Sequence, residues 1–232
     1  MKLIKHNAII FTIIFVIIFV ISISVFALHL AHSYKETFQN TDPKNIILLG
    51  DSIFKNNVYV PYGSSIEAQL KNRAPTKELL CLAQDNSTIM DVYKQVEQIP
   101  EQYNASITSI FLSVGGNDIL ENYVYDYTDV DNMQTLNNSF IEYKKLIKTI
   151  QSKMPKATLV ILDIYYPDNK RFKSFYPIID EWNNLIYEYA KTNNIRVIKI
   201  SNILTDADDF SFAIEPSSIG GNKIVNELLM NR

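Results

Sequence analysis

The sequence predicts an α/β domain of three layers, with helices on both faces of a five-stranded parallel sheet. Short apolar runs alternate along the chain with longer amphipathic stretches, which is the order typical of βαβ units. Prolines punctuate the same pattern, because four of them stand at expected element boundaries, where a missing backbone donor is tolerated: Pro43, Pro75, Pro155 and Pro216.

Each predicted element follows from this alternation. The strands are the five short apolar runs at 45–49, 78–83, 109–114, 158–164 and 195–200. Helices are predicted at 65–73, 87–99, 133–154, 176–192 and 218–230. The stretch from Leu120 to Asn132 mixes tyrosines with acidic residues, which favours a solvated loop with partly packed rings over a substrate lid.

The N-terminal segment predicts attachment to a membrane. No charge interrupts the run from Ala8 to Leu28, and as a helix this run would be about 31 Å long, close to the ~30 Å of a bilayer core. The apolar part of a secretory signal is usually only about 7 to 15 residues, so an uncleaved anchor is favoured over an export signal.

The predicted organisation is therefore an anchor or signal at 1–32, a stem at 33–44 and one domain at 45–232. Basic residues on the two sides of the uncharged run weakly favour a cytoplasmic N-terminus. The expectation is a single-pass membrane protein with an extracytoplasmic domain, and a secreted protein is the alternative.

Composition excludes several classes of function. The net charge of −3 leaves no basic excess for nucleic acid. Cys81 is the only cysteine, so no internal disulfide can form, and a buried strand position is expected for it. The chain has no Walker loop, no Rossmann glycine fingerprint and no His/Cys cluster, and we expect neither a cofactor nor a metal. Asp206, Asp208 and Asp209 are interpreted as a polar loop rather than a calcium site.

Polar residues follow the first three predicted strands. Gly50-Asp51-Ser52 follows the first, Gln84 to Ser87 the second, and Gly115 to Asp118 the third. The carboxyl ends of parallel strands share one edge of a sheet, so these residues are expected to converge there. Acyl transfer needs a nucleophilic oxygen, a base and donors aimed at the oxyanion. Taken singly, each motif is more simply a helix cap or a tight turn.

Together and in this order, the motifs resemble the SGNH/GDSL hydrolase family. LLGDSI matches its first block, with Ser52 as nucleophile, and SVGGNDIL matches its third, with Asn117 as a side-chain donor to the oxyanion. The second block of the family supplies a glycine whose backbone N–H completes the oxyanion hole. Asn86 stands there in LAQDNSTIMDV, and asparagine tolerates a positive φ. The resemblance covers about 45–229 and implies a flavodoxin-like SGNH fold.

The last block departs from the family pattern Asp-x-x-His-Pro-Ser. Phe212 takes the aspartate position and Glu215 the histidine position. The three histidines, His6, His29 and His32, all lie in or beside the hydrophobic segment. Two interpretations remain: Glu215 is the base, with its pKa raised by burial, or the site is catalytically inactive and Glu215 only caps the last helix.

The predicted function is therefore a membrane-anchored esterase that acts on an O-acyl ester, acetyl or fatty-acyl, of a small molecule, lipid or glycan. Ser52 attacks, Asn117 and the N–H groups of Ser52 and Asn86 hold the oxyanion, and Glu215 accepts the proton. Asp209 is the next candidate for the base. The alternative is an inactive module of the same fold that binds a glycan or a lipid.

Overall fold

A five-stranded parallel sheet is the centre of the fold. The computed structural model describes residues 22, 24, 43–122 and 129–230. Its main sheet has the order β2-β1-β3-β4-β5, with every neighbouring pair parallel. The strands are β1 (Asn45–Gly50), β2 (Glu78–Cys81), β3 (Thr108–Ser113), β4 (Thr158–Leu162) and β5 (Arg196–Ile198). The five-stranded parallel sheet of the sequence prediction is confirmed.

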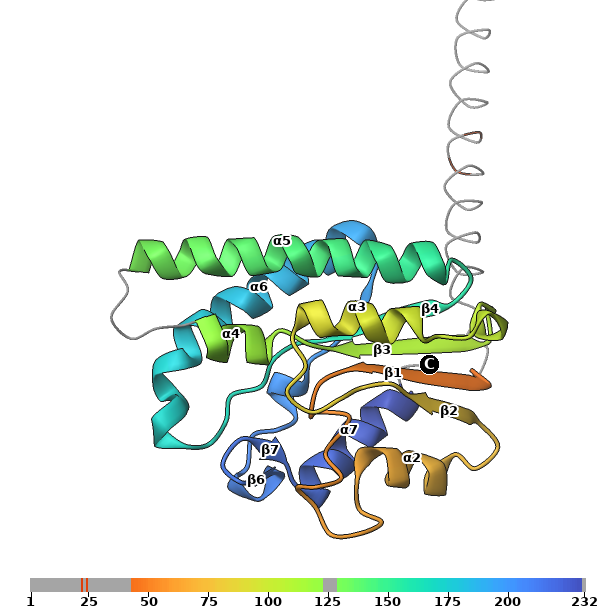
Figure 1. The fold of residues 1–232 in the computed structure, drawn as a ribbon, viewed down its shortest axis with the longest axis horizontal. Helices are drawn as coiled ribbons and strands as arrows, with labels where there is room; N and C mark the ends of the chain where they lie inside the picture. Colours follow the sequence, from red (N-terminus) through yellow and green to blue (C-terminus); the bar gives the residue numbers. More distant parts are fainter. Residues whose placement is uncertain (1–21, 23, 25–42, 123–128, 231–232) are drawn as a thin grey trace, which may run out of the picture. The chain divides into compact units, whose positions relative to one another are not determined.

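Helices cover both faces of this sheet, which confirms the three-layer prediction (Figure 1). One face packs on α3 (Ile89–Glu97), α5 (Asp129–Lys153) and α6 (Tyr176–Asn193). The other face packs on α2 (Ile66–Arg73) and α7 (Ser218–Met230). Successive strand residues point to opposite faces, so Ile47 and Leu49 belong to the first core while Ile46 and Leu48 belong to the second.

Several short elements were not predicted. They are the helix α4 (Gly116–Asn122), the 3₁₀ turns η1 (Glu101–Tyr103), η2 (Lys170–Phe175), η3 (Ile200–Asn202) and η4 (Ala207–Asp209), and the hairpin of β6 (Phe210–Ser211) with β7 (Glu215–Pro216). In α4 only Ile119 is buried, so its sequence has no apolar period to reveal a helix.

Several predicted boundaries also change, and two of them show why. The stretch 120–132 is not one loop, because α4 continues to Asn122 and α5 begins at Asp129, while 123–128 lie outside the described residues. The predicted strand 158–164 ends at Leu162, where its pairing with the three-residue strand β5 ends. The strand stops there because its partner stops, which the local sequence does not show.

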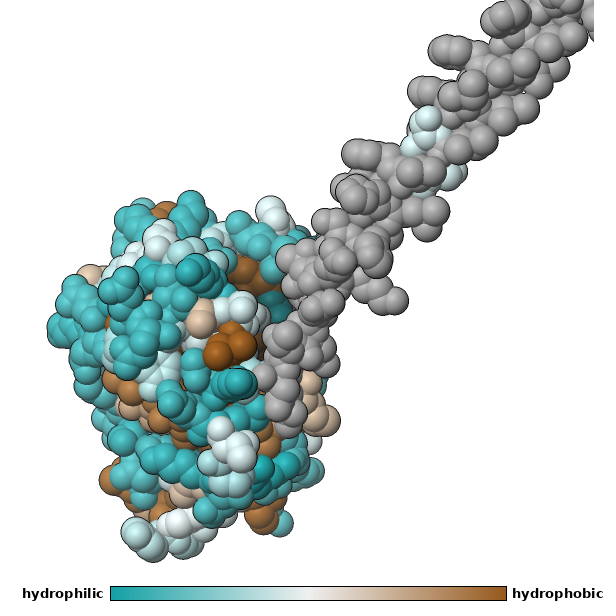
Figure 2. All heavy atoms as spheres, turned by 90° about the vertical axis from the view of Figure 1, so that its right-hand side faces the viewer, coloured by the Kyte–Doolittle hydropathy of each residue, from teal (hydrophilic) through white to brown (hydrophobic). Residues whose placement is uncertain are grey.

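The chain divides into two units, residues 1–41 and 42–232, and all the elements named above belong to the second. Its face in Figure 2 is mostly hydrophilic, with apolar residues scattered over it. Among the described residues, no helix is both long and apolar enough to cross a bilayer. The uncharged run from Ala8 to Leu28 lies outside the described residues except for Ser22 and Ser24, so the anchor stays a prediction.

The strand order places a crevice at the carboxyl edge of the sheet. The chain runs outward from β1 to β2 and then returns to β3 on the other side of β1. Connections after β1 and β3 therefore leave in opposite directions, and open parallel sheets bind ligands at such a switch point.

Candidate active site

The loop after β1 carries Ser52 to the rim of this crevice. Gly50 pairs with Ser113 of β3 and has a φ of 128°. A Cβ atom on Gly50 would lie 1.7 Å from the Ser113 carbonyl oxygen, so only glycine permits this approach. The chain turns there and Ser52, 9% exposed, lines a cavity.

Asn117 reaches the same cavity from the first turn of α4. The chain enters this helix through Gly115, whose φ is 118° and where a Cβ atom would lie 2.5 Å from the Trp182 ring. The Asn117 amide donates to the Ser87 carbonyl oxygen at 3.0 Å. A side-chain amide has two N–H donors, so one remains for an oxyanion.

Asn86 follows β2 and also lines the cavity. Its φ is 57°, the positive value expected where the related proteins have glycine. Among the described residues, the backbone N–H groups of Ser52 and Asn86 make no hydrogen bond. Two free backbone donors and one free amide donor therefore border the same cavity as the serine.

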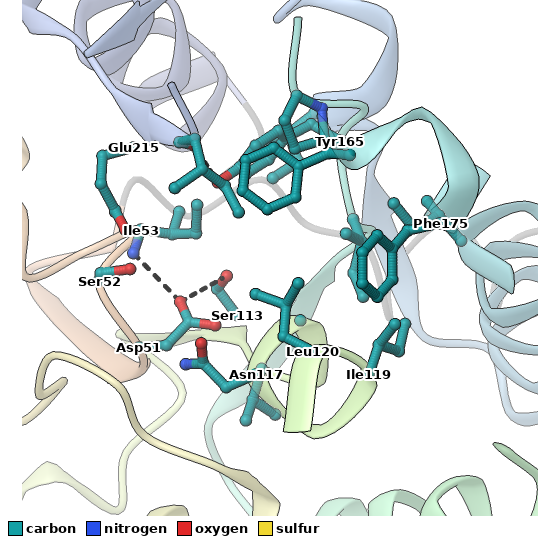
Figure 3. A pocket seen from close by; sticks show the side chains of 18 of the residues that line it. Asp51, Ser52, Ile53, Ser113, Asn117, Ile119, Leu120, Tyr165, Phe175 and Glu215 are labelled. Atoms are coloured by element: carbon teal, nitrogen blue, oxygen red, sulfur yellow. Dashed lines mark hydrogen bonds between the residues drawn. The ribbon is translucent and has the colours of Figure 1, made fainter. Parts of the chain in front are cut away.

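Glu215, the first residue of β7, points its carboxylate toward the Ser52 hydroxyl (Figure 3). Burial is the main cause that raises the pKa of Glu215 above its ordinary 4.5, and nearby Asp85 adds to it, while a hydrogen bond with Ser52 opposes it. Glu215 Oε2 is buried without a hydrogen-bond partner among the described residues. Ile214, the residue before Glu215, is held in place by Tyr165, whose hydroxyl donates to the Ile214 carbonyl oxygen at 2.6 Å.

The structure places Asp209, the second candidate for the base, away from the cavity. Its Oδ2 accepts the N–H groups of Thr205 and Asp206, each at 3.0 Å, and the Lys223 ammonium at 2.8 Å. Lys223 also pairs with Asp206 at 2.9 Å. Lys223 thus bridges two carboxylates of the acidic loop, and Asp209 stabilises this loop instead of facing Ser52.

Two further carboxyl groups line the cavity, and sequence reasoning gave neither a role. Asp163 follows β4 and accepts the Ser201 and Tyr187 hydroxyl groups, both at 2.5 Å, so it joins three elements. Asp51 is 6% exposed. Its pKa is raised to about 7, mainly by burial and in part by the charge of nearby Glu215.

Gln95 of α3 ties the loop of the serine to the loop of Asn117, and sequence reasoning missed it. Its side chain accepts from the Gly50 N–H and donates to the Gly50 carbonyl oxygen, both at 2.8 Å. It also donates to the Ser87 hydroxyl at 3.1 Å, and Ser87 binds Asn117. The available signal was one buried glutamine on the apolar face of a helix.

The cavity has a volume of about 660 Å³ and two chemically different ends. Asp51, Ser52, Asn117 and Glu215 stand at the polar end, and Ile119, Leu120 and Phe175 face them across the space (Figure 3). Other apolar side chains also line the cavity: Ile164, Tyr165, Phe172, Ile179 and Ile214.

This geometry agrees with a comparison of the sequence with known families. Residues 48–217 match the profile of the GDSL-like lipase/acylhydrolase family. The chain belongs to this family. Its Gly-Asp-Ser turn and its Gly-Gly-Asn-Asp turn are both inside the matched range.

Several solved structures share the fold. A G-D-S-L lipolytic protein from Veillonella parvula superposes with a TM-score of 0.64 at 20% identity, over 80% of this chain and 96% of that chain. Phospholipase A1 from Streptomyces albidoflavus gives 0.58 at 14% identity, over 82% and 98%. An acetyl xylan esterase gives 0.60 at 17% identity, over 81% and 98%.

Replacing Gln95 tests its role in joining the two loops. In Gln95→Leu the Gly50 N–H loses its partner inside the core, and a buried unsatisfied donor costs roughly 1–3 kcal/mol. The free energy of unfolding should fall by about that amount, measured by urea unfolding of the full chain in mild detergent, with the fluorescence of Trp182, the only tryptophan, as probe.

Gln98→Leu is the control, because Gln98 is exposed at the C-terminal end of α3 and its side chain donates to the Lys94 carbonyl oxygen. Equal stability of the two variants would show that Gln95 does not hold the loops together.

Proposed function

We propose that this chain is a membrane-anchored serine hydrolase of O-acyl esters whose general base is a carboxylate. The observation that supports it is the contact between the Ser52 hydroxyl and the Glu215 carboxylate at the end of a cavity. The described part of the chain contains no histidine, so no imidazole from that part competes with Glu215 for the proton.

The reaction proceeds in two steps. Ser52 Oγ attacks the acyl carbonyl carbon while Glu215 takes the hydroxyl proton, and this proton then passes to the departing alcohol. The tetrahedral oxyanion is held by the Asn117 amide and by the N–H groups of Ser52 and Asn86. Water next attacks the acyl-serine, and Glu215 again accepts and returns a proton.

Glutamate can fill this role without the aspartate that normally accompanies histidine. An aspartate stabilises the imidazolium that forms on histidine, whereas a carboxylate becomes neutral when it accepts a proton. Glu215 therefore needs no aspartate to balance a positive charge, and Phe212, at the aspartate position, is 75% exposed. The two replacements are thus chemically consistent with each other. The raised pKa of Glu215 makes it a stronger base than an exposed glutamate.

The cavity favours an acyl chain longer than acetyl. Its far end is lined by aromatic and aliphatic side chains, and about 660 Å³ is far more than a two-carbon group occupies. Burial of each CH₂ group contributes about 0.8 kcal/mol, so an apolar end of this kind stabilises a fatty-acyl chain. The phospholipase A1 and the acetyl xylan esterase of the same fold show that acyl size is not set by the fold itself.

The uncharged run from Ala8 to Leu28 supports a single-pass anchor with a cytoplasmic N-terminus and an extracytoplasmic hydrolase domain. Such an anchor would keep the cavity near lipid or surface-glycan esters.

A second candidate is an inactive module that binds a lipid or glycan. The observation that favours it is the unpartnered Glu215 Oε2, since no second residue orients this carboxylate oxygen among those described. Reaction of the full chain with a serine-directed phosphonate separates the two candidates: labelling of Ser52 supports the hydrolase, and absence of labelling supports the module.

Glu215→Gln should lower kcat about as much as Ser52→Ala, because it keeps the shape of the side chain and removes its basicity, and residues that act as one unit are not additive. In the parent protein, kcat/KM should rise with pH as Glu215 ionises, at a pKa above the ordinary 4.5. Hydrolysis of a soluble p-nitrophenyl ester gives both readings. Full activity of Glu215→Gln together with an inactive Ser52→Ala would show that another group takes the proton.

Acyl-chain length should control the rate. From acetate to octanoate, kcat/KM should rise about four-fold for each added CH₂ until the apolar end is full. Leu120→Trp should remove most of this gain, because Leu120 projects into the cavity. Met90→Trp is the control, since Met90 is 60% exposed outside the cavity. A rate that is highest for acetate would contradict the fatty-acyl proposal.

The anchor makes a separate prediction. The full-length protein should remain in the membrane fraction through a carbonate wash and keep its N-terminus, because the uncharged run is long enough to span a bilayer. Recovery of a soluble chain that begins near Leu28 would indicate a cleaved signal.

A further inference from the structure

We propose that Asp51 works as a neutral acid beside the nucleophile, and that its ionisation switches the hydrolase off at alkaline pH. Glu215 then carries the only negative charge next to Ser52 during turnover. This inference rests on the proposed function, and it assigns to Asp51 a role as a positioning residue that controls the charge of the site.

The geometry of Asp51 leaves one of its two carboxyl oxygens open to a proton. The Ile53 N–H, at 3.1 Å, and the Ser113 hydroxyl, at 3.3 Å, both bind the same oxygen, Oδ1 (Figure 3). These two hydrogen bonds lower the pKa of Asp51, but burial, the largest cause, outweighs them. Oδ2 accepts no hydrogen bond among the described residues and is the oxygen that can carry the proton. A side chain only 6% exposed is also poorly placed to hold a charge that nothing neutralises.

The charged groups around Asp51 give it no counter-ion. Among the described residues, no lysine, arginine or histidine forms an ion pair with it. Arg171, a cation that lines the cavity, stacks over the Phe172 ring with its guanidinium 4.8 Å from the ring centre.

The other titratable groups facing this site are acidic. Glu215 is the anion that most opposes ionisation of Asp51. Tyr165 is buried beside both carboxyl groups, and its pKa lies well above 10.0. Beyond Glu215, Asp85 accepts the Tyr59 hydroxyl at 2.7 Å. Asp163 lines the same cavity.

Ionised Asp51 would oppose catalysis at the oxyanion. Asp51 lies between Ser52 and Ser113, from which the chain continues to Asn117, so it stands beside the oxyanion donors (Figure 3). Turnover moves the negative charge from Glu215 to the oxyanion, and a fixed carboxylate next to that position raises the barrier.

Two carboxyl groups set the pH profile, because activity needs Glu215 ionised and Asp51 protonated. Activity rises as Glu215 ionises, above pH 4.5, and falls as Asp51 ionises, at about pH 7. The result is a bell-shaped dependence of kcat/KM on pH.

Asp51→Asn tests this role, because the asparagine oxygen can accept both existing hydrogen bonds and cannot ionise. The variant should keep the acid limb and lose the alkaline limb. The ratio of its kcat/KM to that of the parent should therefore rise from pH 6 to pH 9 by about 10- to 100-fold, as expected for a group that ionises near neutrality. A parent rate that still rises at pH 9, or an alkaline limb that persists in Asp51→Asn, would overturn the proposal.

Asp118→Asn is the matched control. Burial raises the pKa of Asp118 to about 6, but its carboxylate accepts the Ile89 N–H at the start of α3 and lies outside the cavity. Both limbs should keep their positions in this variant. Loss of the alkaline limb in Asp118→Asn as well would remove Asp51 from the explanation.

Thermal stability tests the neutral state of Asp51 without an activity assay. A buried acid whose pKa is raised in the folded state stabilises that state at low pH and loses this contribution as pH rises from about 4 to 7. The melting temperature of Asp51→Asn should therefore increasingly exceed that of the parent from pH 5 to pH 8. A difference independent of pH would overturn the neutral acid. If the parent shows this trend but hydrolyses no ester, the result contradicts the proposed hydrolase function and leaves the neutral acid in place.

Discussion

The close approach of β1 to β3 at Gly50 is the constraint on which the site depends. The two strands pair up to Gly50 and Ser113, with no room for a side chain on Gly50. The chain must turn there, and this turn places Ser52 beside the start of α4. Gln95 secures the turn by binding both backbone groups of Gly50. Ser52 and Asn117 are thus positioned by backbone geometry, which packing makes rigid.

Charge is the second constraint, because the titratable groups beside Ser52 are carboxyl groups and the described residues contain no histidine. Burial raises the pKa of both Glu215 and Asp51, and the charge of Glu215 further disfavours ionisation of Asp51. Two carboxyl groups at one site cannot both ionise easily, so their environments separate an acid from a base. A histidine would have supplied a base of ordinary pKa near ~6.5; here the surrounding protein has to shift a carboxylate upward instead.

The cavity links this chemistry to the choice of substrate. The polar groups come from the carboxyl ends of β1 and β2, from the first turn of α4 and from β7, while the rest of α4, η2 and the start of α6 supply much of the apolar lining. Changes in η2 or at the start of α6 can therefore alter the apolar lining without touching Ser52 or Asn117. A phospholipase and an acetyl xylan esterase share this fold.

The sequence by itself determined the sheet, the main helices and the likeness to a hydrolase family, because apolar periodicity and turn motifs are local signals. It also showed that Ser52, Asn86, Asn117 and Glu215 follow strands that share one edge. Only the tertiary structure decided between Glu215 and Asp209 as the group facing Ser52, since both lie in one loop and their distances depend on how it folds back. The roles of Gln95 and Asp51 were also hidden, because burial and the hydrogen bonds of a side chain are set by residues far away in the sequence.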